Sequence, residues 1–320
     1  MNQKSGKNKN WSSGRRTNKS SAGIRHQLLR NKYIIASVIV VLCLVSGLIY
    51  IVEHKHTTEQ AKVSSDSIIR RIISISLRKF PDDMNDADFA KIVQLNLDKR
   101  ELTDINLLSK FTNLKKLSIV DTGITSLEPL AGLTNLTTLS LTDTLVRSLE
   151  PVSKLTNLQD IYIVGSGITN LEPLAGLTNL ITLSITDSQV RNLEPVSELK
   201  SLQILYIENT KVEDIEPLKG LVNLISLQLI GSGISNIEPL KGLDELRMLY
   251  LNNTSVSDIT PLEGLTNLQV LNLRNTKVSS LEPLKKLDYL QVLDIAGCKN
   301  ITQEQVDALK KALPDLAVSK

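Results

Sequence analysis

The chain has 320 residues, of which 41% are hydrophobic but only 3% aromatic, and it contains two cysteines. A core built mainly from leucine, isoleucine and valine is typical of a repeat architecture rather than of a mixed globular domain. The formal net charge is +3. Residues 1–32 hold nine basic residues and no acidic one, so the rest of the chain is net acidic. This distribution argues against a nucleic-acid-binding domain, because no basic face marks the folded part.

The segment 33–52, YIIASVIVVLCLVSGLIYIV, carries no charge. Since about twenty apolar residues span a bilayer as a helix, we predict one membrane-spanning helix at 33–52. The basic tail before it (1–32) is predicted to be disordered and cytoplasmic, with the C-terminal part on the outer side of the cytoplasmic membrane. A cleaved signal peptide is the alternative, but no small-residue cleavage pattern follows Gly47. The bulky residues before Cys43 argue against a lipoprotein signal.

A unit of 22 residues recurs from Leu95 without insertion or deletion. Its starts are Leu95, Leu117, Leu139, Ile161, Leu183, Leu205, Leu227, Leu249, Leu271 and Leu293. Eight of the ten prolines fall on one register of this unit: Pro129, Pro151, Pro173, Pro195, Pro217, Pro239, Pro261 and Pro283. A period of 44 residues is superimposed, since LEPVSKL at 149 matches LEPVSEL at 193. Stacked coils, with one block duplicated, explain both periods.

Each position of the unit has a physical role. Leu-x-Leu, as in Leu139 to Leu141, predicts a short strand with two inward side chains, so that stacked units form a parallel sheet. The proline suits the start of a short helical turn. Because 22 residues leave little room for an α-helix, we expect 3₁₀ turns on the outer side. The asparagine of Leu-Thr-Asn-Leu, as at Asn135, suits the tight return into the next strand.

This pattern resembles the 22-residue class of leucine-rich repeats, and the L-x-P-L-x-x-L-T-N-L stretch resembles bacterial internalins, over roughly residues 66–320. The resemblance implies an α/β fold: a right-handed solenoid with parallel strands on the concave face, 3₁₀ turns on the convex face, and a role in binding partners. One departure concerns the asparagine ladder of such repeats, which is replaced here. The replacing residues are Thr122, Thr144, Ser166, Ser188, Thr210, Ser232, Thr254, Thr276 and Cys298. Hydroxyls bond the turn backbone less fully than an amide does.

Helical caps are predicted at both ends, because an uncovered solenoid exposes its core. In front, the segment Ser67–Phe80 places five apolar residues near one helical face: Ile69, Ile72, Ile73, Leu77 and Phe80. Asn85 and Asp88 predict a second helix start. At the back, Thr302 and Gln305 form a capping-box pattern. The expected organisation is a tail at 1–32, a membrane helix at 33–52, a stalk at 53–65, a cap at 66–94, repeats at 95–297 and a cap at 298–320.

The residue between the two strand leucines faces the free side of the sheet. Three of the six tyrosines, Tyr162, Tyr206 and Tyr250, occupy this row at every second unit, about 10 Å apart. Tyrosine is a common anchor in protein interfaces. We therefore hypothesise a partner-binding surface of seven residues: Tyr162, Tyr206, Tyr250, Met248, Ile204, Ile230 and Val270. The alternative is that the duplication copied a strand-favouring tyrosine.

Other carboxylates and histidines offer weaker patterns. Asp121, Asp143 and Asp187 recur at one edge and would suit a cationic partner or calcium, but Gly165 interrupts them and favours a solvated edge. The glutamates before the prolines suit the start of a helical turn. His54 and His56 are spaced like metal ligands, but two stalk histidines are weak support for a site.

No catalytic constellation is visible, since the repeats contain no histidine, no Gly-rich phosphate loop and no Ser–His–Asp set. We predict a non-enzymatic interaction module without cofactor, metal, nucleic-acid or small-molecule substrate, which binds a protein or peptide on its concave face. A structural envelope scaffold is one alternative. A regulatory subunit that binds an enzyme is another, and it requires the repeats to be cytoplasmic, against the charge rule.

Overall fold

The computed structural model describes residues 64–98 and 101–320. The predicted tail, the membrane-spanning helix at 33–52 and nearly all of the stalk lie outside the described residues. Within the described ranges, no helix is long and apolar enough to cross a membrane.

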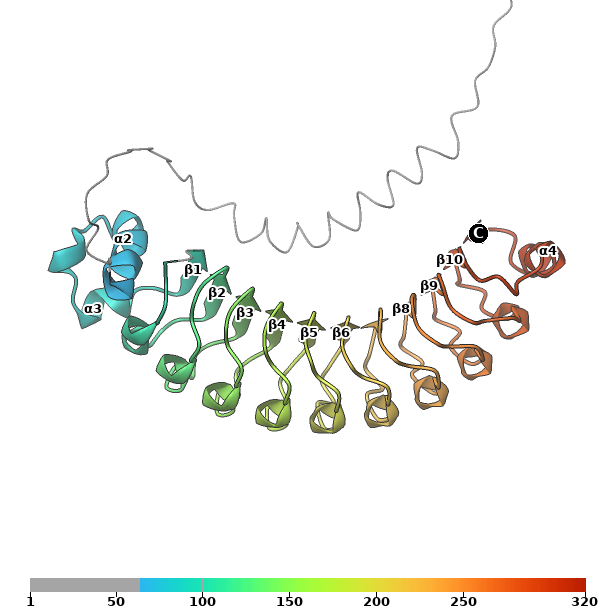
Figure 1. The fold of residues 1–320 in the computed structure, drawn as a ribbon, viewed down its shortest axis with the longest axis horizontal. Coiled ribbons are helices and arrows are strands. Elements are labelled where there is room, and N and C mark those ends of the chain that lie inside the picture. The colour runs from blue at the N-terminus through green and yellow to red at the C-terminus, as the bar shows by residue number, and fades with distance from the viewer. Residues whose placement is uncertain (1–63, 99–100) are drawn as a thin grey trace, which may run out of the picture. The chain divides into compact units, whose positions relative to one another are not determined.

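The described residues form one parallel sheet of eleven strands that follow one another in chain order. The strands are β1 (Gln94–Asp98), β2 (Lys116–Val120), β3 (Thr138–Thr142), β4 (Asp160–Val164), β5 (Thr182–Thr186), β6 (Ile204–Glu208), β7 (Ser226–Gln228), β8 (Met248–Tyr250), β9 (Val270–Asn272), β10 (Val292–Asp294) and β11 (Ala317–Ser319). Figure 1 shows them along the inner, concave side of an arc of stacked coils.

The register confirms the 22-residue unit. Leu117 lies opposite Leu139 and Leu205 opposite Leu227, and every pair from β1 to β10 keeps this offset. The final strand was not predicted: Val318 of β11 pairs with Leu293 after the C-terminal cap. It gives β10 a hydrogen-bonded neighbour, so that the last repeat does not end the sheet as an open edge.

Nine 3₁₀ helices cover the convex side (Figure 1). They are η2 (Asn106–Lys110), η3 (Glu128–Leu130), η4 (Glu150–Val152), η5 (Glu172–Leu174), η6 (Glu194–Val196), η7 (Glu216–Leu218), η8 (Glu238–Leu240), η9 (Thr260–Leu262) and η10 (Glu282–Leu284). From η3 onward the glutamate or threonine is the first residue and the proline the second. The glutamate ladder therefore lies at the start of helical turns, which is favourable for a carboxylate.

A polar side chain two residues before each of these turns accepts a hydrogen bond from the first backbone N–H of the turn. The acceptors are Asp104, Ser126, Ser148, Asn170, Asn192, Asp214, Asn236, Asp258 and Ser280. One donor that the turn itself cannot satisfy is thereby paired in every unit. This repeated cap was not recognised in the sequence.

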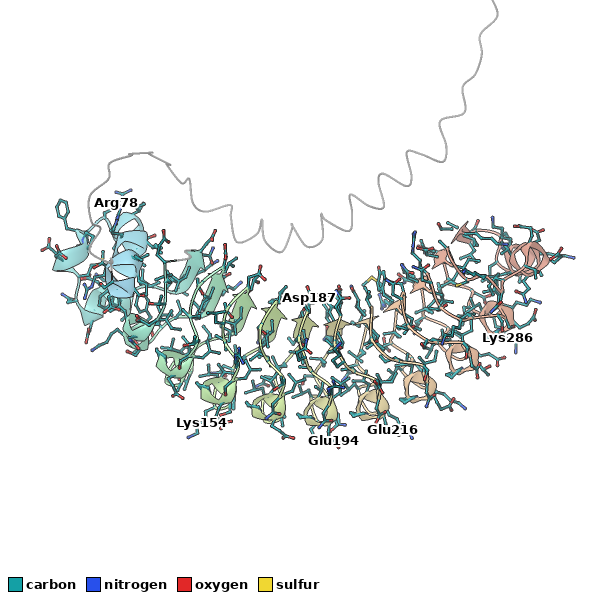
Figure 2. The ribbon with its side chains drawn as sticks, viewed as in Figure 1. Arg78, Lys154, Asp187, Glu194, Glu216 and Lys286 are labelled. Carbon is teal, nitrogen blue, oxygen red and sulfur yellow. The ribbon has the colours of Figure 1, made fainter. Side chains whose placement is uncertain are left out.

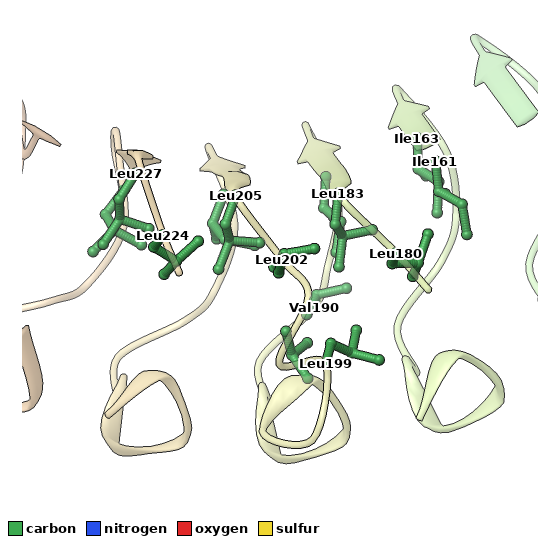
Figure 3. Packing of buried hydrophobic residues seen from close by; sticks show 14 of the residues in the cluster. Ile161, Ile163, Leu180, Leu183, Val190, Leu199, Leu202, Leu205, Leu224 and Leu227 are labelled. Atoms are coloured by element: carbon green, nitrogen blue, oxygen red, sulfur yellow. The ribbon is translucent and has the colours of Figure 1, made fainter. Parts of the chain in front are cut away.

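A single hydrophobic core runs through the coils. Leu183, Leu205 and Leu227 stack from strand to strand beneath the sheet, with Leu180, Leu202 and Leu224 beside them (Figure 3). Burying each such side chain contributes about 1.5–3 kcal/mol relative to leaving it exposed. Every coil repeats the same aliphatic contacts, and two stacked phenylalanines, Phe89 and Phe111, are buried at the N-terminal end of the core.

Helices close both ends of this core. In front lie α2 (Ser65–Leu77), the 3₁₀ helix η1 (Pro81–Asp83) and α3 (Asp86–Phe89). Ile69 and Ile73 are buried, but Phe80 is 78% exposed, which corrects its predicted place on the buried face. The reason is that α2 ends at Leu77 and a left-handed Arg78 turns the chain away.

The predicted capping box at Thr302 and the predicted helix start at Asn85 are both present, and the helix start is a capping box as well. Asn85 and Asp88 cap α3, and Asp88 also accepts ion pairs from Lys79 and Lys91 at 2.6 and 2.9 Å. Together these contacts hold the pKa of the Asp88 carboxyl far below its usual value, with the Lys79 hydrogen bond the largest cause. At the other end, Thr302 and Gln305 cap α4 (Gln303–Ala312).

Candidate partner-binding face

The strand register brings the three predicted tyrosines into one row. Tyr162 and Tyr206 each lie opposite Ser184, on the strand between them. Tyr206 and Tyr250 likewise lie on either side of Gln228. Two strand spacings separate neighbouring tyrosines, about 9.6 Å at the backbone. All three are half-buried, while Ser184 is buried. The row therefore alternates between a tyrosine and a smaller, non-aromatic side chain.

A second row runs parallel to the first, one pleat toward the start of the strands. It places Ile204, Ser226, Met248 and Val270 side by side on β6 to β9. The three apolar members are half-buried. Five of the predicted anchors thus lie together on β6 to β9: Ile204, Tyr206, Met248, Tyr250 and Val270.

Ile230 does not offer contact surface, because it is only 8% exposed. The five-residue strand expected there is shortened: β7 ends at Gln228, and Ile230 lies in the turn that follows. The candidate surface is therefore corrected to six residues: Tyr162, Ile204, Tyr206, Met248, Tyr250 and Val270.

Tyr206 and Tyr250 are electrostatically coupled. Burial raises the pKa of the Tyr250 phenol above its usual value of 10.0, and the neighbouring Tyr206 raises it further. The Tyr250 phenol therefore stays neutral at physiological pH, where it can donate and accept hydrogen bonds.

Two buried polar atoms beside Tyr250 have no hydrogen-bond partner among the described residues. They are Oγ of Ser226, in a residue 1% exposed, and Oδ1 of Asn252, in a residue 4% exposed. Ser226 precedes Gln228 on β7, and Asn252 lies two residues after Tyr250. Leaving a buried polar group unpaired costs about 1–3 kcal/mol. Sequence reasoning missed both, because their burial depends on the neighbours that the register supplies.

The aspartates at the edge of the face have a conformational explanation. The residue after each long strand, and its equivalents elsewhere, adopts a left-handed backbone at every 22nd position: Asp121, Asp143, Gly165, Asp187, Asn209, Gly231, Asn253, Asn275 and Gly297, with φ between 50 and 82°. Aspartate, asparagine and glycine are the residues that tolerate this conformation. Gly165 therefore belongs to the same series of left-handed residues as the aspartates, and this backbone conformation explains why they recur.

Neighbouring rungs of this ladder also bond one another. Nδ2 of Asn209 donates to Oδ1 of Asp187 at 2.9 Å, and Nδ2 of Asn275 donates to Oδ1 of Asn253 at 2.8 Å. In the part of the chain that the structure describes, no group of three or more His, Cys, Asp or Glu side chains is placed to hold a metal ion.

The Ser/Thr/Cys ladder that follows is buried and unevenly bonded. Thr254 and Thr276 donate to backbone carbonyls at 2.6 and 2.7 Å. The hydroxyls of Thr122, Thr144 and Ser166 have no partner within the described residues. Hydroxyls at this ladder therefore bond the turn backbone in some units and not in others.

Charge is distributed unequally along the concave side. Over β3 to β6 it carries Asp143, Asp160, Asp187 and Glu208, and the sequences of these four strands contain no lysine or arginine. Figure 2 shows Asp187 on this concave side, opposite Glu194 and Glu216 on the convex side. The tyrosines 162 and 206 therefore lie in an acidic stretch of surface.

Comparisons with known proteins agree with this architecture. The family model described as Leucine Rich repeats (2 copies) matches residues 112–155, 178–220 and 266–311. No curated protein matches the chain.

Among solved structures, the internalin InlF of Listeria monocytogenes is similar with 23% identity and a TM-score of 0.66, over 81% of this chain and 92% of that one. Internalin C2 of the same organism is 29% identical with a TM-score of 0.62, over 68% of this chain and 100% of that one. The plant peptide hormone receptor RGFR1, solved in complex with RGF2, is 16% identical with a TM-score of 0.51, over 70% and 48%. Three segments of the chain thus match the leucine-rich-repeat model, and the fold is structurally similar to that of Listeria internalins.

Proposed function

We propose that this chain is a non-catalytic interaction module whose concave face binds a protein or peptide partner. The observation that carries the proposal is the aligned row of half-buried Tyr162, Tyr206 and Tyr250, flanked by Ile204 and Met248. Large, rigid aromatic side chains of this kind dominate binding energy in protein interfaces. A structural relative, RGFR1, was solved with a peptide hormone bound, which supports a peptide or protein as the occupant.

A photo-crosslinking amino acid at position 206 or 250 of the full chain tests this proposal. We expect a covalent adduct in cells, and no adduct from the same probe at Tyr289, which is 62% exposed but lies on the return turn before β10. Replacing Tyr206 and Tyr250 by alanine should weaken partner binding by about 2 kcal/mol or more, roughly thirtyfold. Equal adducts at 206 and 289, or undiminished binding by the alanine variant with unchanged folding, would contradict the proposal.

We further propose that residues 33–52 anchor the module in the cytoplasmic membrane, with the repeats on the outer side. The uncharged twenty-residue segment and the basic residues before it support this orientation. The test is a Lys154→Cys variant of the full chain, since Lys154 is exposed on the convex side and Cys298 is buried. A membrane-impermeant thiol reagent should modify Lys154→Cys in intact cells. Modification only after lysis would instead favour a cytoplasmic regulatory subunit.

A further inference from the structure

The spacing of the tyrosine row limits which repeating ligand groups can pack against it. Tyr162, Tyr206 and Tyr250 stand on every second strand, so that neighbouring backbone positions are about 9.6 Å apart. The strands lie on the concave side of the arc (Figure 1), so groups that extend from the concave face converge, and their spacing is shorter than the spacing at the backbone. A repeating ligand that packs against neighbouring tyrosines of this row must present two like groups at about this distance.

Regular peptide conformations differ in the distance between side chains on one face, and therefore in how well they match the tyrosine spacing. A polyproline II helix has three residues per turn and rises about 3.1 Å per residue, which puts every third side chain on one face at about 9.3 Å. An extended strand presents like groups about 6.8 Å apart. An α-helix gives about 5.4 Å for one turn and about 10.8 Å for two. Of these repeats, only that of polyproline II is close to two strand spacings. At about 9.3 Å it is also slightly shorter than the roughly 9.6 Å at the backbone, as the concave curvature requires.

The unpaired atoms beside Tyr250 point independently to a ligand with a free backbone. Oγ of Ser226 and Oδ1 of Asn252 are buried and have no partner among the described residues. A polyproline II segment makes no internal hydrogen bonds, so its carbonyl groups and remaining N–H groups can pair with them. Ser226 lies between Ile204 and Met248 in its row. Because Ser226 is only 1% exposed, a ligand reaches its hydroxyl only if Met248 rotates, and methionine is a flexible side chain.

The charge of the face selects among such ligands. Asp143, Asp160 and Asp187 lie over β3 to β5, and those strands contain no basic residue. Opposite charges across an interface steer encounter and suppress wrong partners. Lysine or arginine at the ligand's outward positions therefore complements the acidic edge of the face over β3 to β5, while its apolar residues pack against the tyrosines.

We propose that the partner presents a basic, proline-rich segment in the polyproline II conformation, which lies across the strands with every third residue packed against Tyr162, Tyr206 or Tyr250. This inference rests on the proposed function and names the class of peptide that the same face recognises. Aromatic-lined grooves favour this ligand class because the helix is already ordered before it binds.

The test is a selection of random twelve-residue peptides displayed on phage against the purified full chain in detergent, with subtraction on the Tyr206→Ala/Tyr250→Ala variant. We expect enriched sequences with proline or another apolar residue at every third position and lysine or arginine between them. Apolar residues that recur at every second position, or at helical spacing, would overturn the proposal. So would the absence of any peptide that depends on the two tyrosines.

Synthetic peptides then separate conformation from charge. Four repeats of Pro-Pro-Lys should bind at least tenfold more tightly than four repeats of Gly-Ser-Lys, which keep the charge but lose the ordered helix, and than four repeats of Pro-Pro-Glu. Ser226→Ala should weaken binding of Pro-Pro-Lys at least threefold without lowering the melting temperature, because its hydroxyl is unpaired in the free protein; Tyr289→Ala should change nothing. Equal affinity for the three peptides, or for wild type and Ser226→Ala, refutes the inference. Should adducts from position 206 persist in cells while these peptides fail, the proposed function stands and only this inference falls.

Discussion

Replacing the ladder glycine Gly165 tests whether backbone conformation, rather than side-chain size, governs the edge of the face. Gly165 has φ +60°, and a Cβ added there would overlap Oδ1 of Asp143. Alanine in this left-handed conformation costs about 1–2 kcal/mol. Asparagine tolerates the conformation, and at the equivalent position Asn209 bonds the preceding rung, Asp187. We therefore expect Gly165→Ala to destabilise by about 1–2 kcal/mol and the larger Gly165→Asn to destabilise less.

Urea titration followed by far-UV circular dichroism measures both free energies of unfolding. Gly132→Ala is the matched control, since Gly132 has no positive φ and a Cβ there would meet nothing within 4 Å. That variant should be stabilised by about 0.4–1 kcal/mol through the unfolded state. If Gly165→Ala proves as stable as Gly165→Asn, or behaves like Gly132→Ala, the conformational account of the ladder is wrong.

Three further outcomes are expected. Thr144→Val should leave the free energy of unfolding unchanged or raise it, because the Thr144 hydroxyl is buried without a partner in the described chain. Thr276→Val should instead lower the free energy of unfolding by about 1 kcal/mol, because it loses the bond to the carbonyl of Leu273. Urea titration of both variants compares them directly. Asp88→Asn should remove stability that is present above the unfolded carboxyl pKa of about 3.9 and is lost as pH falls, since the Asp88 pKa is lowered in the folded state; an unchanged acid-unfolding curve below pH 4 would contradict this. Tyr250 has a raised pKa, so its contribution to stability is present below about pH 10 and declines above it; Tyr250→Phe should flatten that alkaline decline, and absorbance at about 295 nm should show one tyrosine fewer titrating late.

The repeat register, the buried leucines and both caps were predictable from the sequence, because they depend on periodicity and on local capping. The offset between Leu117 and Leu139 follows from the unit length alone, and Thr302 and Gln305 announce α4 by their spacing. The tyrosine row followed equally from the register.

Features that depend on how the chain turns between units were not predictable in the same way. Ile230 was placed on the free face, but β7 ends two residues before it and the turn buries it. The left-handed ladder at Asp143 and Gly165 was read as an interrupted carboxylate row, since backbone angles leave only a compositional trace. The isolation of Ser226 arises from its neighbours on two adjoining strands, which no local pattern encodes.

The constant offset between successive strands also determines how such a protein can change length. Since each coil meets only its neighbours, gain or loss of whole 22-residue units leaves every remaining junction matched. Removal of a single unit between Tyr162 and Tyr206 would place the two phenols on adjacent strands and eliminate the Ser184 position between them. Gain or loss of 44 residues instead keeps a tyrosine on every second strand, so the binding surface can lengthen by pairs of coils without a change in the tyrosine spacing.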